Sequence, residues 1–121
     1  MKTIGIVGSR RRNGAPDMKA IEEVLLTNYE DGDRIVSGGC PVGADCFAEY
    51  LAKKHQIPIL IHYAKWSKYG NRAGFVRNND IARDADLLIA CVAEDRKGGT
   101  EDTIQKFLNL FQKSPDKVIL V

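Results

Sequence analysis

The feature that most constrains this chain is a regular alternation between short apolar runs and stretches with helical periodicity. Five runs are rich in branched residues and nearly continuous in apolar character, which is typical of strands buried on both faces. They span Thr3–Val7, Arg34–Val36, Pro58–Ile61, Leu87–Val92 and Lys117–Val121. The segments between them carry apolar residues at the spacing of one helical face, around residues 21–25, 47–55 and 104–111, with a weaker helix predicted over 74–84.

Five strands alternating with four helices predict an α/β fold. We expect a three-layer, Rossmann-like, doubly wound parallel sheet of about five strands with helices on both faces. Right-handed crossovers leave few topologies, of which we favour strand order 3-2-1-4-5 over the flavodoxin-like order 2-1-3-4-5. No linker or internal repeat divides the chain, so residues 1–121 are interpreted as a single domain. Ligands of such sheets bind beyond the carboxyl ends of the strands, which makes the loops after the first four strands the expected site.

Composition excludes several classes of protein. A net charge of +2, with 44% hydrophobic and 28% charged residues, is typical of a chain that buries a core and not of a disordered one. The longest apolar run has about six residues, far below the roughly 20 that span a bilayer. Three irregularly spaced cysteines do not form a disulfide framework, and with two histidines they give no zinc-site spacing. We expect a cytoplasmic protein with no signal peptide, membrane segment, metal or cofactor.

The loop after the first strand combines glycine, a hydroxyl group and cations. Gly8, Ser9 and Arg10 leave the strand, and two further arginines follow. A glycine at this position allows the close approach of an anion, although a solvated basic loop is an equally good interpretation. The dinucleotide fingerprint G-x-G-x-x-G is absent, which disfavours a nicotinamide-dependent dehydrogenase.

The loop after the second strand is the richest in glycine. Its notable residues are Ser37, Gly38, Gly39, Gly43, Ala44 and Asp45. Three glycines before a helix allow backbone amides to surround a phosphate. The spacing of Gly38 and Gly43 is similar to that of a P-loop, but Ala44 and Asp45 stand where Lys and Ser/Thr are required, which excludes NTPase chemistry. The structural alternative is a turn in which Asp45 stabilises the start of the helix through its dipole.

The segment after the third strand, residues 62–79, interleaves cations with aromatic residues. Four cations and no acid lie between Ala64 and Asn79, and Trp66, Arg72 and Arg77 with Asn78 are its candidate ligand-binding residues. Cations with aromatic rings are suited to a phosphate and a stacked base, and also to single-stranded nucleic acid. A structureless loop of this length in a small domain is usually functional, although its rings can instead pack against the loop itself.

The loop after the fourth strand ends in Gly98, Gly99 and Thr100, directly before the last helix. Two glycines and a hydroxyl at a helix start are typical of an anion-binding nest. Thr100 acting simply as the N-cap of that helix is the structural alternative, and it is compatible with anion binding.

Taken in order along the chain, these motifs resemble the YspA-like branch of the SLOG superfamily, which also includes the LOG phosphoribohydrolases and the DprA DNA-processing proteins. The resemblance is carried by Ser37-Gly38-Gly39, Gly43-Ala44-Asp45, Trp66, Tyr69-Gly70, Arg72-Ala73-Gly74, Arg77-Asn78, Ala85-Asp86-Leu87, Ile89-Ala90 and Gly98-Gly99-Thr100. It covers nearly the whole chain and implies a Rossmann-like fold, a nucleotide-derived ligand and a homo-oligomer, often with sites completed across the interface.

The resemblance also implies catalytic roles for two residues. Arg77 matches the LOG arginine at the start of the preceding helix, and Asp102 stands where LOG enzymes have a catalytic glutamate. In that case Arg77 holds a phosphoribosyl unit while Asp102 stabilises an oxocarbenium ion or activates water. The sequence departs from LOG enzymes in this shorter acid and in Arg96-Lys97-Gly98, which replaces their Pro-Gly-Gly.

Two functions follow from these observations. In the first, a nucleotide or ADP-ribose-like ligand places its phosphate on Gly38–Gly43 and Gly98–Thr100, with Arg10, Arg72 and Arg77 neutralising its charge, and the reaction of an enzyme of this kind is N-glycosidic cleavage. The alternative is single-stranded nucleic-acid binding of the DprA type through the basic segments after the first and third strands. A net charge of +2 is small for a dedicated polyanion binder, so we rank it second.

Overall fold

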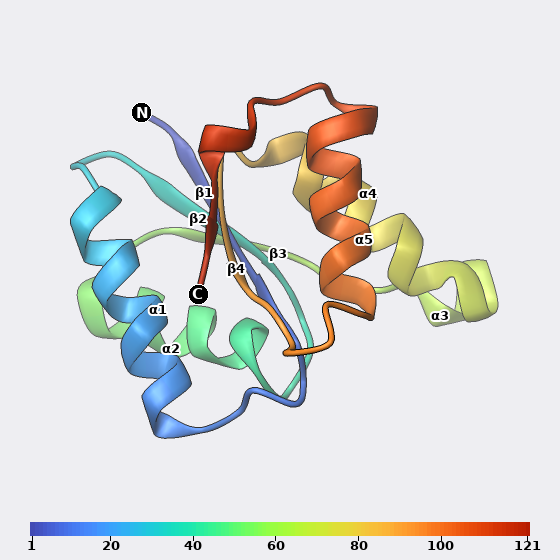
Figure 1. The fold of residues 1–121 in the computed structure, drawn as a ribbon, viewed down its shortest axis with the longest axis horizontal. Helices are drawn as coiled ribbons and strands as arrows, with labels where there is room; N and C mark the ends of the chain where they lie inside the picture. Colours follow the sequence, from blue (N-terminus) through green and yellow to red (C-terminus); the bar gives the residue numbers. More distant parts are fainter.

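Five parallel strands form one sheet in the order β3-β2-β1-β4-β5 (Figure 1). The computed structural model describes residues 1–121, and its strands are β1 (Thr3–Gly8), β2 (Arg34–Gly38), β3 (Ile59–His62), β4 (Leu87–Cys91) and β5 (Val118–Leu120). The predicted α/β class and strand order 3-2-1-4-5 are therefore confirmed, and the flavodoxin-like order is excluded. β1 and β4 are neighbours at the centre of the sheet, where the strand order reverses.

Helices cover both faces of the sheet. They are α1 (Ala15–Asn28), α2 (Ala44–His55), α3 (Trp66–Tyr69), α4 (Ala73–Asp84) and α5 (Gly99–Gln105), which continues into a π-helix at Lys106–Leu110. Figure 1 shows α1 and α2 on one face, α4 and α5 on the other, and α3 standing away from the layers. None of these helices has the length and apolar character that crossing a bilayer requires.

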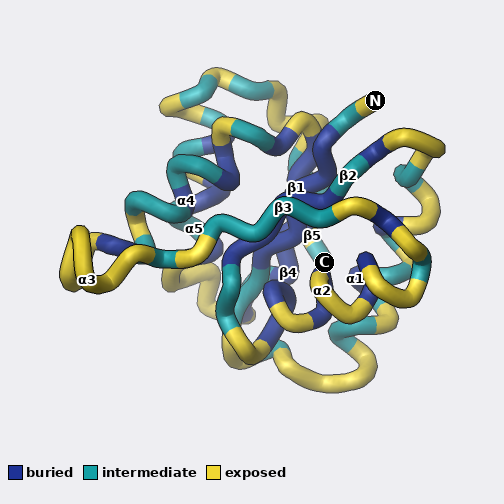
Figure 2. The backbone as a smooth tube through the Cα atoms, turned by 180° about the vertical axis from the view of Figure 1, so that it is seen from behind, coloured by how far each residue is buried: buried dark blue, intermediate teal, exposed yellow.

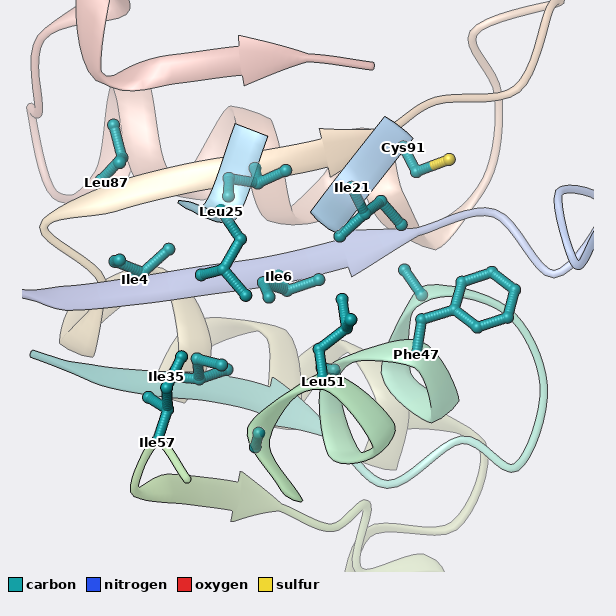
Figure 3. Close-up of a cluster of buried hydrophobic side chains, with 14 residues drawn as sticks. Ile4, Ile6, Ile21, Leu25, Ile35, Phe47, Leu51, Ile57, Leu87 and Cys91 are labelled. Atoms are coloured by element: carbon teal, nitrogen blue, oxygen red, sulfur yellow. The ribbon is translucent and has the colours of Figure 1, made fainter. Parts of the chain in front are cut away.

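Side chains of β1 alternate between two buried clusters. Ile4 and Ile6 pack with Ile21, Leu25 and Leu51 of α1 and α2 (Figure 3). The next residue, Val7, belongs instead to a cluster on the α4 and α5 face that includes Leu88, Ile81 and Phe107. Because successive side chains of a strand point to opposite faces, a strand covered on both sides needs an uninterrupted apolar run, which is the pattern seen in the sequence.

The segment after β3 differs in part from the structureless loop that the sequence predicts. It contains α3 and a 3-10 turn at Gly70–Arg72, whereas α4 is the helix predicted over 74–84. Gly70 ends α3 with a φ of +57°, a left-handed conformation that glycine adopts without strain. No residue of α3 or of the turn is buried, so these helical segments have no apolar stripe for the sequence pattern to display.

Asp33 ties the start of β1 to the turn before β2. Its buried carboxylate accepts hydrogen bonds from the Lys2 amide at 2.8 Å, the Lys2 ammonium at 2.5 Å and the Glu30 amide at 2.9 Å. Burial alone would raise the pKa of Asp33, but the hydrogen bonds from Lys2 and Glu30 outweigh it and lower the pKa from 3.8 to about 2. The folded state is therefore stabilised by the ionised form of Asp33.

Substitution of Asp33 by Asn should change the acid stability of the protein. Since the pKa of Asp33 is lower in the folded than in the unfolded chain, its contribution is complete above about pH 4 and is lost as the pH falls towards 2. That contribution is about 2 kcal/mol. We expect Asp33→Asn to lower the free energy of unfolding at neutral pH and to flatten its decline between about pH 4 and pH 2, measured by urea unfolding.

The exposed Asp31 in the same turn supplies the control, because its carboxylate accepts no hydrogen bond. Asp31→Asn should keep the acid dependence of the wild type. An Asp33→Asn protein with the wild-type dependence would contradict the assignment.

Candidate functional site

A cavity of about 270 Å³ opens at the carboxyl ends of β1 and β4. These strands flank the point at which the strand order reverses, where open α/β sheets bind ligands. Of the residues predicted from the sequence, the cavity lining includes Gly8, Ser9, Arg10, Asp45, Arg77, Asn78, Gly98, Gly99 and Thr100. The loops after β1 and β4 thus converge with α4 and the start of α2 on one site.

Cations without acidic partners dominate the lining. Arg10, Arg77 and Lys97 form no ion pair within the chain, whereas Arg11 is paired with Asp95 at 2.7 Å outside the lining. Asp45 is the one acid among the lining residues. Three unpaired cations against one carboxylate give the cavity a positive potential that attracts anions.

Asn78 fixes the orientation of the Arg77 guanidinium. Arg77 Nε donates to Asn78 Oδ1 at 3.0 Å, and neither terminal guanidinium nitrogen donates a hydrogen bond within the chain. The Asn78 side chain is buried, and its Nδ2 donates to the Gly99 carbonyl at 3.3 Å and to Asp102 Oδ2 at 3.1 Å. Arg77 is therefore held from behind, with two nitrogens available to a ligand.

Asp102, predicted to be catalytic, lies behind Asn78 and does not line the cavity. Its Oδ2 accepts from both Asn78 and Lys106, the latter as an ion pair at 2.6 Å. Oδ1 accepts no hydrogen bond within the chain. The carboxylate is thus positioned to orient Asn78, and through Asn78 the guanidinium of Arg77.

Gly38 and Gly39 provide space for two side chains from other elements. A Cβ atom on Gly38 would lie 2.5 Å from Arg77 Nη1, and one on Gly39 would overlap the ring of Tyr63. Nearby amides of the same loop are already used, because Cys40 donates to Asp45 Oδ2 at 3.1 Å. The structure therefore gives the first two glycines a role different from the predicted phosphate cradle.

The remaining glycine of that loop is also internally bonded. Gly43 begins α2 with a φ of +78°, and its amide donates to Asn13 Oδ1 at 2.7 Å. The single hydroxyl hydrogen of Ser37 is shared between two acceptors, the Ile6 carbonyl at 2.7 Å and Asp45 Oδ1 at 3.0 Å. Asp45, in the first turn of α2, therefore holds this loop in place through its contacts with Ser37 and Cys40.

Eight predicted residues do not line the cavity. Trp66 and Arg72 are exposed on the segment around α3, where Figure 2 shows the chain standing away from the body. Ala44 lies against Gly8 in the protein interior. The full set is Ser37, Gly38, Gly39, Gly43, Ala44, Trp66, Arg72 and Asp102.

The loop after β4 presents free backbone amides to the cavity. Gly98, with a φ of +116°, is the N-cap of α5, so the alternative that Thr100 is the N-cap is wrong. The first amides of a helix have no acceptor within it, and no loop or side-chain group accepts from those of Gly99 and Thr100. Both residues line the cavity beside Lys97.

The predicted ligand-binding set does not include Arg11, Lys97 or Thr103, which also line the cavity. Lys97 directly precedes Gly98, and Arg11 directly follows Arg10. Both therefore stand next to predicted site residues, and this position could have indicated them. Thr103 had no such signal: it faces the cavity because it lies one helical turn after Gly99, whose carbonyl accepts from its hydroxyl at 3.2 Å. No group of three or more His, Cys, Asp or Glu side chains is placed to hold a metal ion.

The fold and the cavity define a class: a doubly wound α/β protein with a cation-lined pocket at its topological switch point. Comparisons with protein-family models, with curated proteins and with solved structures found no match for this chain. The residues of the site itself therefore indicate the function.

Gly8 is a point of close approach at the cavity that a stability measurement can test. A Cβ atom there would lie 2.7 Å from Ala44 Cβ and 2.8 Å from Cys91 Cβ, neither of which moves without the backbone. We expect Gly8→Ala to lower the free energy of unfolding by about 1–3 kcal/mol. Gly74→Ala is the control, because its nearest neighbour would be 3.9 Å away and alanine favours the helix by up to about 1 kcal/mol. If Gly8→Ala and Gly74→Ala changed the free energy of unfolding in urea equally, the close packing around Gly8 would be contradicted.

Proposed function

We propose that this chain binds a phosphorylated, nucleotide-derived small molecule, a nucleotide or an ADP-ribose-like compound, in the cavity beyond β1 and β4. The observation that carries the proposal is the gathering of Arg10, Arg77 and Lys97, all without acidic partners, around the free amides of Gly99 and Thr100. Guanidinium groups, ammonium groups and helix-start amides are the donors that proteins use for phosphate oxygens. The common ligand for all of them is a phosphate.

The size of the cavity limits how much of the ligand it holds. Its volume of about 270 Å³ is slightly below the roughly 300–1,000 Å³ of ordinary small-molecule pockets. The cavity is therefore suited to the phosphate and the adjoining sugar. A nucleobase would extend beyond it, over neighbouring side chains.

The order of the motifs along the chain supports placing it near the YspA-like branch of the SLOG superfamily. Under this proposal the protein is a cytoplasmic homo-oligomer, in keeping with its three free cysteines. The cavity, with the glycines and cations of the β4 loop at its centre, is the part of the structure that agrees best with the resemblance.

Hydrolysis of an N-glycosidic bond is the reaction that the resemblance adds to binding. In it Arg77 holds the phosphoribosyl unit. Asp102, which the resemblance makes catalytic, lies behind Asn78 outside the cavity lining, so it contributes by orienting Asn78 and, through Asn78, Arg77. Incubation with nucleoside monophosphates and chromatography for free base tests this step. If the wild-type protein releases free base and the Asp102→Asn variant does not, the protein is an enzyme. If the protein binds nucleoside monophosphates but releases no base, it is a ligand-binding protein without this activity.

Loss of one unpaired cation should weaken ligand binding. We expect Arg77→Gln to raise the Kd for nucleoside monophosphates about 10- to 100-fold, because a hydrogen bond to a charged group contributes about 1.5–3 kcal/mol and about 1.4 kcal/mol is a factor of ten. Isothermal titration calorimetry measures the change. Lys53→Gln, which removes an unpaired cation exposed on the last turn of α2, should bind as the wild type does.

Two outcomes would contradict the proposal. One is the absence of binding to every nucleoside monophosphate and to ADP-ribose. The other is an equal loss of affinity in the Arg77 and Lys53 variants, since that result would show attraction to the overall charge and not to the cavity.

Single-stranded nucleic-acid binding is a second candidate, favoured by the exposed segment around α3. Lys65, Lys68 and Arg72 form no ion pair there, and the rings of Trp66 and Phe75 are more than half exposed. Exposed rings among unpaired cations provide stacking surfaces and phosphate contacts for a flexible strand. Figure 2 shows the exposed residues of α3 projecting from the body of the molecule.

The second candidate makes its own prediction. A mobility shift of a single-stranded oligonucleotide should weaken steeply with salt, and Lys68→Gln with Arg72→Gln should reduce the salt slope by about 0.7 for each phosphate contact removed. Trp66→Ala should weaken binding at every salt concentration because base stacking is lost. A shift that is absent, or insensitive to salt, would exclude this function.

A further inference from the structure

A second hollow, the tyrosine cleft, adjoins the cavity across Arg77. Its walls include Tyr63, which follows β3, Lys65, Tyr69 of α3, and Asp80 of α4. Arg77 is the one residue that lines both the cavity and this cleft. The two hollows therefore share one residue, Arg77.

Each tyrosine of the cleft presents an aromatic ring to solvent. Tyr63 is 61% exposed and Tyr69 is 36% exposed. The Tyr63 ring rests on Gly39, where any side chain would overlap it, and the adjacent Gly38 provides the same kind of space for Arg77. Two consecutive glycines thus each make room for a side chain, Gly38 for Arg77 and Gly39 for Tyr63. The exposed Tyr63 ring is open to contact by a ligand.

We propose that the nucleobase of the ligand lies on the rings of Tyr63 and Tyr69 while its phosphate occupies the cavity, with Arg77 between the two. This inference rests on the proposed function and names the part of the ligand that the cavity cannot hold. The cleft itself has a volume of about 40 Å³, close to the roughly 30 Å³ that one water molecule occupies. The base therefore lies across the mouth of the cleft, against the exposed rings.

Polar groups at the cleft favour a nitrogen heterocycle over a plain hydrocarbon ring. Lys65 forms no ion pair and offers a donor. Asp80 uses Oδ1 for an ion pair with Arg83 at 3.0 Å, while its Oδ2 accepts no hydrogen bond. A donor and a free acceptor beside stacking surfaces match the edge of a nucleobase, which carries both kinds of group.

Binding of nucleoside 5′-monophosphates can be compared with binding of ribose 5-phosphate, which has the same phosphate and sugar but no base. We expect the wild-type protein to bind at least one of the four common nucleoside monophosphates more tightly than ribose 5-phosphate. Tyr63→Ala and Tyr69→Ala should weaken binding of that nucleotide about 5- to 150-fold and leave ribose 5-phosphate unchanged, because base stacking alone is lost.

Controls separate stacking from other effects of substitution. Tyr63→Phe keeps the ring and should retain wild-type affinity. Tyr50→Ala removes a tyrosine that is 52% exposed on α2, outside both hollows, and should change neither ligand. Gly39→Ala displaces the Tyr63 ring without deleting it, and should weaken nucleotide binding as Tyr63→Ala does. Calorimetry provides each Kd.

The outcomes distinguish this inference from the proposed function. Equal affinity of the wild type for nucleotides and ribose 5-phosphate, or tyrosine variants that alter neither, would overturn the base subsite while phosphate binding stands. Equal weakening of both ligands by Tyr63→Ala would also overturn it, since the ring would then act only by placing Arg77. Absence of binding to any phosphorylated compound would overturn the proposed function itself.

Discussion

Burial of the central strands on both faces is the constraint on which the rest of the molecule depends. Ile4 and Ile6 of β1 belong to one buried cluster and Val7 to the other, so the strand must be covered from both sides. Covering both sides requires connections that leave β1 and β4 towards opposite faces, as Figure 1 shows for α1 and α5. The space beyond the ends of these two strands is then left without a helix above it. The cavity is a consequence of the topology before any residue of the site is considered.

Charge pairing determines which cations of this region are available. Arg11 pairs with Asp95, and Arg96 pairs with Glu101 at 2.7 Å, so these arginines organise the loops after β1 and β4. Asp102, which lies one residue from Glu101, is paired with Lys106 and not with Arg77. Asp95, Glu101 and Asp102 are thus each paired with a cation other than Arg77. Arg77, oriented by Asn78, keeps its charge for a ligand, which makes the pairing pattern as important to the site as the cations themselves.

The sequence was sufficient for the fold because the relevant signals are local. Each apolar run indicates a strand buried on both faces, and the preference for right-handed crossovers then limits the possible strand orders. The glycines that line the cavity after β1 and β4 were predictable for a similar reason, because a glycine in the loop that follows a parallel strand lies at the carboxyl edge of the sheet.

The second glycine loop was not predictable, because its role depends on distant residues. Gly38 and Gly39 match an anion-binding turn in sequence, but their space is filled by Arg77 and Tyr63 from later elements. The same limit applies to Asp102, whose oxygen is engaged by Asn78, a partner 24 residues away. Only the tertiary structure distinguishes a glycine that exposes its amides from one that makes room for a side chain.

The segment between β3 and α4 is shaped by different requirements from the rest of the chain. Residues 63–72 contribute no buried residue, and none of them belongs to or packs against either core cluster. Its exposed rings and unpaired cations are therefore available to a ligand without loss of core packing. Since Tyr63 and Tyr69 border the cleft that shares Arg77 with the cavity, they are placed to contact the part of a ligand that lies outside the cavity.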